Sequence, residues 1–292
     1  MDSGLLIVDK PSGWTSHQVV GRVRRLMSTR KVGHAGTLDP MATGVLVVGV
    51  GRATRLLGHL ALHDKDYTAT IRLGVTTVTD DAEGDVVATA DASALSEVRI
   101  AEAMAPLRGE IMQVPTAVSA IKVNGKRSYA RVRAGEAVEL AARPVTVSRF
   151  QTVEVRREGE AVDVDVEVTC SSGTYVRALA RDLGGSLGVG GHLTALRRTR
   201  IGPYTLPAEA VDLSEDAPRP GLMTMAEAAR LSFPAVELDA GQEADLRVGR
   251  RLEIVVPADP TAMISGASGE FLALYRPDPE RPGWSRAVAV LV

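Results

Sequence analysis

Apolar residues near the N-terminus form short unbroken runs separated by a segment of helical periodicity. The runs GLLIVDK (4–10) and VLVVGVG (45–51) predict two buried strands. Between them, HQVVGRVRRLM (17–27) repeats apolar residues at helical spacing, and Thr15 or Ser16 is suited to cap the helix. The first part of the chain therefore predicts strand, helix and strand.

The middle of the chain continues to mix the two periodicities. DYTATIRLGV (66–75) is rich in β-branched residues, and AVDVDVEVTC (161–170) alternates valine with polar or acidic residues, as a half-exposed strand does. YVRALARDLGGSLG (175–188) has helical spacing. Because strands and helices are mixed rather than strictly alternating, we predict an α+β fold with a mixed, mainly antiparallel sheet.

The pattern changes after SEDAPRPG (214–221), an acidic, proline-rich stretch that interrupts regular structure. One more helix is predicted at TMAEAARLS (224–232), and short strands dominate from there on. The strands expected in this tail are RRLEIVV (250–256), GEFLALYR (269–276) and RAVAVLV (286–292). We predict a larger domain over 1–233 and a small β-barrel over 234–292.

Composition narrows the class of protein. No run of apolar residues is long enough to cross a membrane, and the short apolar run at the N-terminus follows an acid rather than a base, unlike a signal peptide. Cys170 is the single cysteine, which excludes a disulfide framework and predicts a small core residue. A soluble, cytoplasmic protein is expected.

The net charge of −2 hides a segregated distribution. Lys and Arg outnumber Asp and Glu in residues 1–60, 114–150 and 195–205, and the rest of the chain is correspondingly acidic. If the basic segments share one surface, they predict a nucleic acid partner and salt-dependent binding. The alternative is an ordinary solvated surface of mixed charge.

Asp39 lies in a glycine-rich loop, GHAGTLDPMATG (33–44), before a buried strand. Pro40 moves the preceding residue away from helical conformation, so Asp39 is presented from a loop. The glycines allow the backbone to approach a ligand closely, and the strand supplies a rigid platform. A catalytic carboxylate and a simple Asp-Pro turn both fit this loop.

Arg177 is expected in the first turn of a helix, where the helix dipole disfavours a cation. Neither Ala180 nor Arg181 offers an acid at helical spacing, so a partner from elsewhere is expected. Asp39 or an RNA phosphate would serve, and a guanidinium would keep Asp39 ionised and oriented. A solvated surface arginine remains the alternative.

The loop around Asp39 and five further segments together resemble the TruB family of pseudouridine synthases, in particular its bacterial branch. The segments appear in family order over most of residues 4–204. They are VDKPSGWTSH, KVGHAGTLDPMATGVL, KDYTATIRLG, SAIKVNGKRSYARVRAG, SSGTYVRALARDLG and HLTALRRTRIGPY. The resemblance implies a pseudouridine synthase fold for the larger domain and a PUA-like barrel for the tail.

The resemblance also implies a reaction. Such an enzyme isomerises one uridine, at position 55 in the T-loop of tRNA, by breaking the N1–C1′ bond, turning the base and rejoining it through C5. The uridine must flip out of its stack. The implied partner is the T-arm stem-loop, with no metal, no cofactor, no membrane, no guide RNA and no obligate protein partner.

Residue roles follow from the matching positions. Those implied to be catalytic are Asp39, Tyr67 and Arg177. Those implied to bind or surround the substrate are His34, Tyr175 and Leu196, with Lys10 in a segment that supports the loop. Seen singly, the tyrosines could be sheet aromatics, the leucine a core residue and the histidine a satisfied loop residue.

Residues 114–150 include a basic, loop-like insertion with a turn at Asn124-Gly125. Its Lys122, Lys126 and Arg127 suit an arm that grips phosphates. The insertion departs from the family at 115–120, which reads Pro-Thr-Ala-Val-Ser-Ala where Pro-Pro-x-Tyr-Ser-Ala is usual, so no contact is carried over there.

Other functions remain open at this stage. A non-catalytic RNA-binding protein could use the same basic surface, and a guide-RNA-dependent synthase could share the same segments. GVGRAT (49–54) also resembles the start of a dinucleotide-binding turn, but Thr54 occupies the third glycine position.

Overall fold

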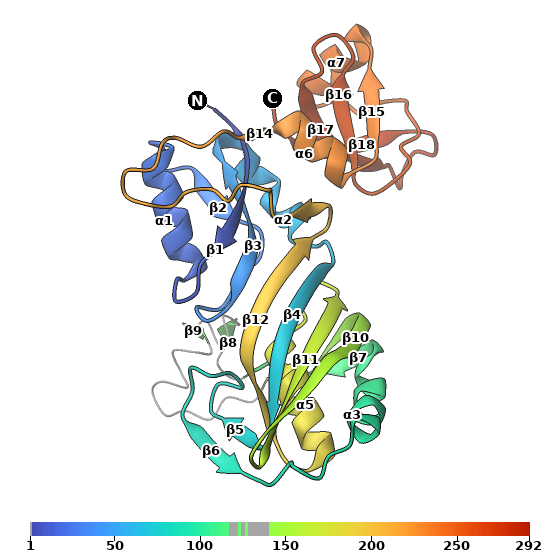
Figure 1. The fold of residues 1–292 in the computed structure, drawn as a ribbon. Helices are drawn as coiled ribbons and strands as arrows, with labels where there is room; N and C mark the ends of the chain where they lie inside the picture. Colours follow the sequence, from blue (N-terminus) through green and yellow to red (C-terminus); the bar gives the residue numbers. More distant parts are fainter. Residues whose placement is uncertain (1, 117–121, 124–125, 128–139) are drawn as a thin grey trace.

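The computed structural model describes residues 2–116, 122–123, 126–127 and 140–292. A long sheet dominates it, with strand order β14-β1-β3-β12-β4-β11-β10-β7, β2 beside β3 and β13 beside β12 (Figure 1). Only β12 and β3 run parallel within this sheet as described, so the predicted mixed, mainly antiparallel sheet is confirmed. Its strands are β1 (Gly4–Lys10), β2 (Val32–His34), β3 (Thr43–Val50), β4 (Lys65–Leu73), β7 (Gly109–Gln113), β10 (Arg143–Glu158), β11 (Ala161–Cys170), β12 (Gly191–Ile201), β13 (Tyr204–Thr205) and β14 (Met223–Thr224).

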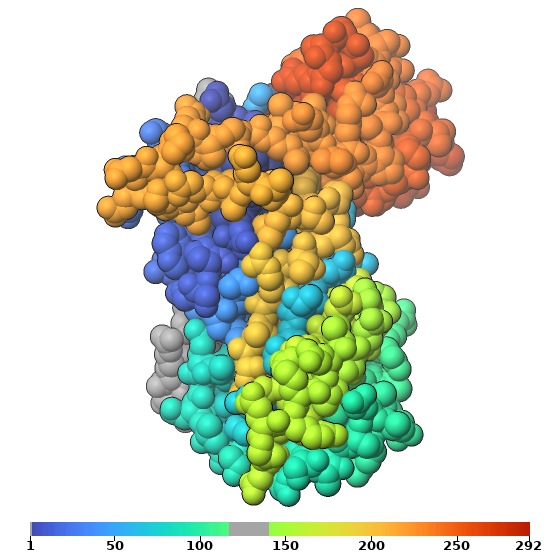
Figure 2. Space-filling view, in the orientation of Figure 1, coloured from blue at the N-terminus to red at the C-terminus, as the bar shows by residue number. Residues whose placement is uncertain are grey.

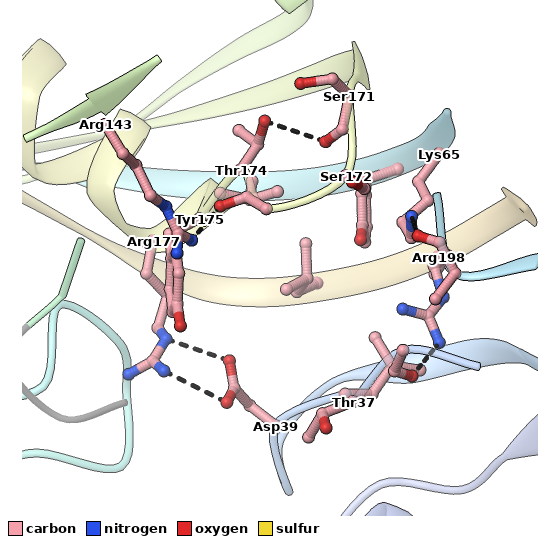
Figure 3. Close-up of a pocket in the computed structure, with 17 residues that line it drawn as sticks. Thr37, Asp39, Lys65, Arg143, Ser171, Ser172, Thr174, Tyr175, Arg177 and Arg198 are labelled. Atoms are coloured by element: carbon pink, nitrogen blue, oxygen red, sulfur yellow. Dashed lines mark hydrogen bonds and ion pairs between the residues drawn. The ribbon is translucent and has the colours of Figure 1, made fainter. Parts of the chain in front are cut away.

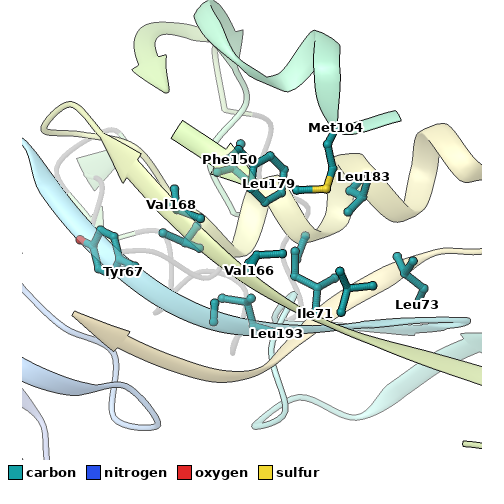
Figure 4. Packing of buried hydrophobic residues seen from close by; sticks show 14 of the residues in the cluster. Tyr67, Ile71, Leu73, Met104, Phe150, Val166, Val168, Leu179, Leu183 and Leu193 are labelled. Carbon is teal, nitrogen blue, oxygen red and sulfur yellow. The ribbon is translucent and has the colours of Figure 1, made fainter. Parts of the chain in front are cut away.

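The longer helices α1, α3 and α5 pack on this sheet, and α2 and α6 pack on the other face of β1 and β3. α3 and α5 cover one face of β4, β11 and β10, where their apolar side chains join the main core (Figure 4). α1 covers β1 and β3, and Thr15 caps it in a capping box with Gln18. The helices are α1 (Ser16–Leu26), η1 (Gly51–Arg55), α2 (Leu57–Leu60), α3 (Glu97–Met104), η2 (Ala105–Leu107), α5 (Val176–Leu187), α6 (Met225–Ser232) and α7 (Ala240–Arg247).

The predicted alternation of valine with polar or acidic residues in β11 gives the strand one apolar face, and the helices pack on that face. The valines at even positions from 162 to 168 are buried in the core beneath α5. Asp163, Asp165 and Glu167 lie on the opposite face, where their carboxylates pair with arginines of β4 and β10. The face opposite α3 and α5 therefore carries charge pairs.

A segment without regular structure connects the main sheet to the C-terminal part. Residues 206–222, orange in Figure 2, run across the N-terminal part of the molecule. Arg22 of α1 donates a hydrogen bond of 2.8 Å from Nε to the carbonyl of Leu213. Leu213 and Leu222 also pack against the core beneath α1. The proline-rich stretch thus interrupts regular structure, as predicted, while staying attached to the surface.

The C-terminal part forms a second sheet of order β15-β16-β17-β18, with α6 and α7 beside it (Figure 1). Its strands are β15 (Ala235–Leu238), β16 (Thr261–Ser265), β17 (Phe271–Pro277) and β18 (Ser285–Val290). The described strands follow an open path, and β15 does not pair with β18, so the sheet is not a closed barrel. Apolar residues of β16 and β17 share one core with β1, β3 and α2.

In the tail, one expected strand is wrong and one helix was not predicted. RRLEIVV (250–256) is not a strand, because only Leu252 forms an isolated bridge, with Ser285. Leu252 and Val256 are buried all the same, so the apolar run anchors a loop instead of pairing along a ladder. Residues 240–247, for which no helix was predicted, form α7.

The predicted insertion is shorter than 114–150, because residues 143–150 belong to β10. Within it, β8 (Lys122–Val123) and β9 (Lys126–Arg127) pair as antiparallel strands. A further small hairpin joins β5 (Val75–Thr77) and β6 (Val86–Thr89). In the described ranges, no helix combines the length and the apolar character needed to cross a membrane.

Candidate active site

A pocket of about 350 Å³ lies where the N-terminus of α5 faces the loop between β2 and β3 (Figure 3). Side chains of β4 and β12 and of the loop before α5 complete it. Its larger or functional lining side chains are Thr37, Leu38, Asp39, Lys65, Tyr67, Arg143, Tyr175, Arg177, Leu196 and Arg198. Segments far apart in sequence therefore meet around one concave site.

The loop that carries Asp39 is supported by buried polar side chains. Lys10 is fully buried, and its Nζ donates to the carbonyl of Pro40 at 3.1 Å and to two carbonyls of residues 11–14. Ser16 Oγ accepts the backbone N–H of the residue before Asp39 at 2.9 Å. Burial lowers the pKa of Lys10 to about 8. Lys10 thus lies beneath the loop and does not line the pocket.

Arg177, the second residue of α5, contacts Asp39 through two nitrogens along one edge of its guanidinium group. Its Nε lies 3.0 Å from one carboxylate oxygen, and its Nη2 donates to the other at 3.1 Å (Figure 3). Its Nη1 lies 3.1 Å from Asp81 and donates to the carbonyl of Thr79 at 2.8 Å. This fork fixes the carboxylate in one orientation.

Arg177 fixes the position of Asp39, and the Asp39 side chain still lines the pocket. Burial raises the pKa of Asp39, the Arg177 guanidinium opposes that rise, and the neighbouring Asp81 carboxylate adds to it. The side chain of Asp39 nevertheless remains 35% exposed, whereas that of Arg177 is 5% exposed. The carboxylate therefore faces the cavity with its partner behind it.

Tyr67, Tyr175 and Leu196 give the pocket its aromatic and apolar surfaces. Tyr67 comes from β4 and Leu196 from β12, and each is 8% exposed. Tyr175 immediately precedes α5 and is half-buried. Burial raises the pKa of Tyr67, while the Arg198 guanidinium opposes the rise through its charge and a hydrogen bond. A planar, neutral group would find apolar surfaces here and a carboxylate at the edge.

The side of the pocket away from Asp39 is cationic. Arg198 is 1% exposed and donates to the carbonyls of Val45 at 2.7 Å and Gly36 at 3.0 Å. Lys65 donates from Nζ to the carbonyls of residues 61 and 63. Burial, with the charge of Arg198 next, lowers the pKa of Lys65 to about 8. Both cations are held by backbone carbonyls.

Not every residue expected at the site lies in the pocket. His34, in β2, is outside the lining and packs its ring 5.7 Å from that of His17. Burial lowers the pKa of His34 to about 4, so its ring is neutral at pH 7. The side chains of Lys122, Lys126 and Arg127 lie outside the described part of the structure, so their expected phosphate contacts stay a prediction.

Asp81, Lys65 and Arg198 belong to the site although sequence reasoning did not select them. Strand alternation could have predicted two of them, because Lys65 lies on the same face of β4 as Tyr67, and Arg198 lies on the same face of β12 as Leu196. Asp81 gave no such signal, because it lies in an acidic stretch that resembles a solvated loop.

Comparison with known families gives two adjoining matches. Residues 24–176 match the family described as "TruB family pseudouridylate synthase (N terminal domain)". Residues 177–216 match the "tRNA pseudouridylate synthase B C-terminal domain". Together these matches cover more than half of the chain and include every lining residue named above.

Curated relatives and solved structures agree with this match. A protein named "tRNA pseudouridine synthase B" from Cutibacterium acnes is 70% identical over 293 residues, covering 100% of this chain and 99% of the relative. A protein of the same name from Rhodococcus jostii is 62% identical over 276 residues, covering 94% and 90%.

Among solved structures, a chain of a Cbf5-Nop10-Gar1 complex aligns with a TM-score of 0.71 and 27% identity, over 98% of this chain and 83% of that one. A chain of the archaeal box H/ACA sRNP Nop10-Cbf5 complex aligns with a TM-score of 0.69 and 26% identity, over 99% and 86%. The chain belongs to the TruB family of pseudouridylate synthases and is an isomerase of that family.

Proposed function

We propose that this protein converts uridine to pseudouridine at position 55 in the T-loop of tRNA, with Asp39 as the essential carboxylate. The substrate class is supported by relatives named tRNA pseudouridine synthase B at up to 70% identity over the whole chain. The observation that carries the proposal is the bidentate contact of Arg177 with both carboxylate oxygens of Asp39 at the wall of the pocket. A buried guanidinium that binds both oxygens of a partly exposed carboxylate orients the carboxylate toward a ligand in the pocket.

The reaction breaks the N1–C1′ bond, turns the uracil and forms a C5–C1′ bond. C5 then releases its proton and N1 takes one up, so the product is an isomer of the substrate. One carboxylate near C1′ and the base is required, and Asp39 is the pocket residue that offers it. Hydrolytic glycosidases usually use two carboxylates with different roles. Asp81, the other acid in contact with Arg177, is 2% exposed and holds the arginine instead of facing the cavity.

The target nucleotide enters the pocket alone. The cavity of about 350 Å³ is near the lower end of the range for small-molecule sites, roughly 300–1,000 Å³, and fits one nucleoside. The uridine is flipped out of its stack to reach it. Tyr67 then stacks on the uracil, Leu196 closes the apolar side, and Tyr175 forms a wall.

The rest of the RNA contacts surfaces outside the pocket. His34 lies near the vacated base, and Lys122, Lys126 and Arg127 grip backbone phosphates. Lys10 supports the active-site loop from below. Residues 1–233 form the catalytic domain, and residues 234–292 act as a PUA-like domain that touches RNA away from the reactive base.

The protein acts on tRNA without a guide RNA or a protein partner. The solved structures with similar folds come from multi-protein complexes, one of them described as an archaeal box H/ACA sRNP complex. Independence of a guide RNA and of partner proteins is therefore a point to test. A T-arm hairpin of about 17 nucleotides contains the target loop and its stem. Modification of that bare hairpin by the purified chain supports the standalone mode, and a strict need for guide RNA contradicts it.

The central test is tritium release from C5-labelled uridine in that hairpin. Wild type should release the label, and Asp39→Asn should abolish release while it keeps hairpin affinity, since the amide preserves shape but not charge. A hairpin with cytidine at the target position controls for site choice. Turnover by Asp39→Asn would refute the role of Asp39. RNA binding without any turnover by wild type would favour a non-catalytic RNA-binding protein.

A further inference from the structure

Two residues outside the expected site hold the pocket wall. Gln113 is the last residue of β7 and Arg143 the first of β10, and they face each other as a register pair in the β7–β10 ladder. Residues 114–142, which include the basic insertion, connect them. The two ends of this insertion therefore meet at one point of the main sheet.

Gln113 holds the backbone at the start of α5. Its side chain is almost completely buried, with 1% exposure of the residue. Its Oε1 accepts the N–H of Tyr175 at 2.8 Å, and its Nε2 donates to the carbonyl of Tyr175 at 3.0 Å. Tyr175 has an extended conformation and no side-chain cap of its own. The Gln113 side-chain amide thus binds both the backbone N–H and the backbone carbonyl of Tyr175, the residue just before α5.

Arg143 holds the ring of the same tyrosine. Its guanidinium carbon lies 4.9 Å from the centroid of the Tyr175 ring, in a cation–π contact. The guanidinium also donates to the carbonyl of Gly173, in the loop before α5. Figure 3 shows Arg143 beside Tyr175, and Arg177 continuing from there toward Asp39. The ring is therefore restrained from the side that faces away from Asp39.

These contacts set the position of the catalytic pair. Arg177 follows Tyr175 by two residues, so a shift of the first turn of α5 would move the guanidinium that aims Asp39. β10 also holds the loop at Ser171, which exchanges two hydrogen bonds with Thr146. A displacement of about 1 Å in an active site can cost on the order of 100-fold in rate.

We propose that Gln113 and Arg143 are positioning residues for uridine isomerisation, which place the Tyr175 ring and, through the start of α5, Arg177. This inference rests on the proposed function, because it assigns the two residues to the same pocket and reaction. It also gives the insertion a link to the chemistry, since both of its ends are joined to the residue that forms the pocket wall.

The experiment measures single-turnover tritium release with excess enzyme, together with the hairpin Kd, for Gln113→Ala, Gln113→Glu and Arg143→Ala. Gln113→Glu keeps the size and the acceptor but lacks the donor to the Tyr175 carbonyl, so it tests the contact without opening a cavity. Matched controls are Gln151→Ala and Arg149→Ala, exposed residues of β10 with the same side chains. The single-turnover rate should fall about 10- to 100-fold in the test variants. Hairpin Kd should change less than about threefold, and both controls should match wild type.

A double-mutant cycle separates positioning from a general structural role. In a Tyr175→Ala background, Arg143→Ala should cost several-fold less in rate than it costs in wild type, because its ring contact is already absent. Unchanged rates in all test variants, equal costs in both backgrounds, or losses confined to Kd would overturn the inference. Failure of the proposed function would be distinct, because wild type itself would then release no tritium from the hairpin.

Discussion

Arg177 and Arg198 lie on opposite sides of one pocket (Figure 3). Both are almost completely buried, with 4% and 1% of the whole residue exposed, but their hydrogen-bond partners differ in kind. Arg177 faces the carboxylates of Asp39 and Asp81. Arg198 donates to the carbonyls of Gly36 and Val45, and no carboxylate in the described part of the chain lies at ion-pair distance from it.

The difference separates two uses of a buried guanidinium. At Arg177, opposite charges fix each other, so the orientation of Asp39 depends on the fork and on both acids. At Arg198, two neutral carbonyls accept hydrogen bonds from Nε and Nη2, so the side chain ties the loop at Gly36 to β3 while its guanidinium lines the pocket. Substitutions on the first side should therefore alter chemistry most, and those on the second side should alter stability and RNA affinity.

Arg177→Lys should give the largest effect. Lysine keeps the charge but offers one ammonium group, which cannot hold both oxygens of Asp39 and also reach Asp81. We expect the single-turnover rate to fall at least about 100-fold, and the hairpin Kd to change only a few-fold. Single-turnover kinetics and filter binding measure the two quantities. Equal losses in both would mean that Arg177 mainly holds RNA.

Asp81→Asn should have the next largest effect. It removes the contact of the buried guanidinium with the Asp81 carboxylate and keeps the contact with Asp39, so the free energy of unfolding should fall by about 3 kcal/mol and the rate about tenfold. Because the Asp81 carboxylate contributes to the raised pKa of Asp39, its removal should move the acidic limb of the pH–rate profile to lower pH. Urea unfolding and rates from pH 4 to 8 test this. An unmoved acidic limb would show that Asp81 does not act on Asp39.

Arg198→Met should cost stability more than rate. It removes the hydrogen bonds to the buried carbonyl of Val45 and the partly buried carbonyl of Gly36, which should lower the free energy of unfolding by about 2 kcal/mol, with a rate loss of about fivefold or less. Arg197→Met is the control, since Arg197 lies on the opposite face of β12 in a half-exposed pair with Asp9. A greater loss of rate than in Arg177→Lys would break the comparison between the two arginines.

The elements predicted from sequence are those whose pattern reflects burial on one face. The alternating valines of β11 and the apolar stripe of α5 are of this kind, and both elements are present. In contrast, α7 buries only Leu246, so its sequence carries almost no helical periodicity. RRLEIVV has the composition of a strand, yet it forms a loop with buried apolar side chains. Burial of these side chains does not determine whether the backbone pairs with a neighbouring strand.

The contacts of the site also differ in whether the sequence could predict them. The helix dipole disfavours a cation in the first turn of α5, which made Asp39 or an RNA phosphate the expected partner of Arg177, and the family resemblance implied Asp39. The structure shows the contact with Asp39. The carbonyl partners of Arg198 could not be predicted, because backbone acceptors leave no trace in side-chain sequence. The catalytic roles of these residues stay predictions until the variants are measured.

The smallest expected effect concerns Lys65, on the cationic side of the pocket. Burial and the charge of Arg198 lower the pKa of Lys65 from 10.5 to about 8, so its ammonium is charged at pH 7 and neutral by pH 9. Cys170, a neighbour whose pKa is raised to about 11 by burial, keeps its proton over that range. RNA affinity should therefore fall about two- to fivefold between pH 7 and 9 in wild type, as one screened charge is lost. Lys65→Met should bind at pH 7 as weakly as wild type does at pH 9 and should show a smaller further change with pH than wild type. Lys10, whose pKa is also about 8, titrates in both proteins, but it lies beneath the loop and does not line the pocket. Filter binding at constant ionic strength measures both, and an equal pH dependence in the two proteins would place the titrating group elsewhere.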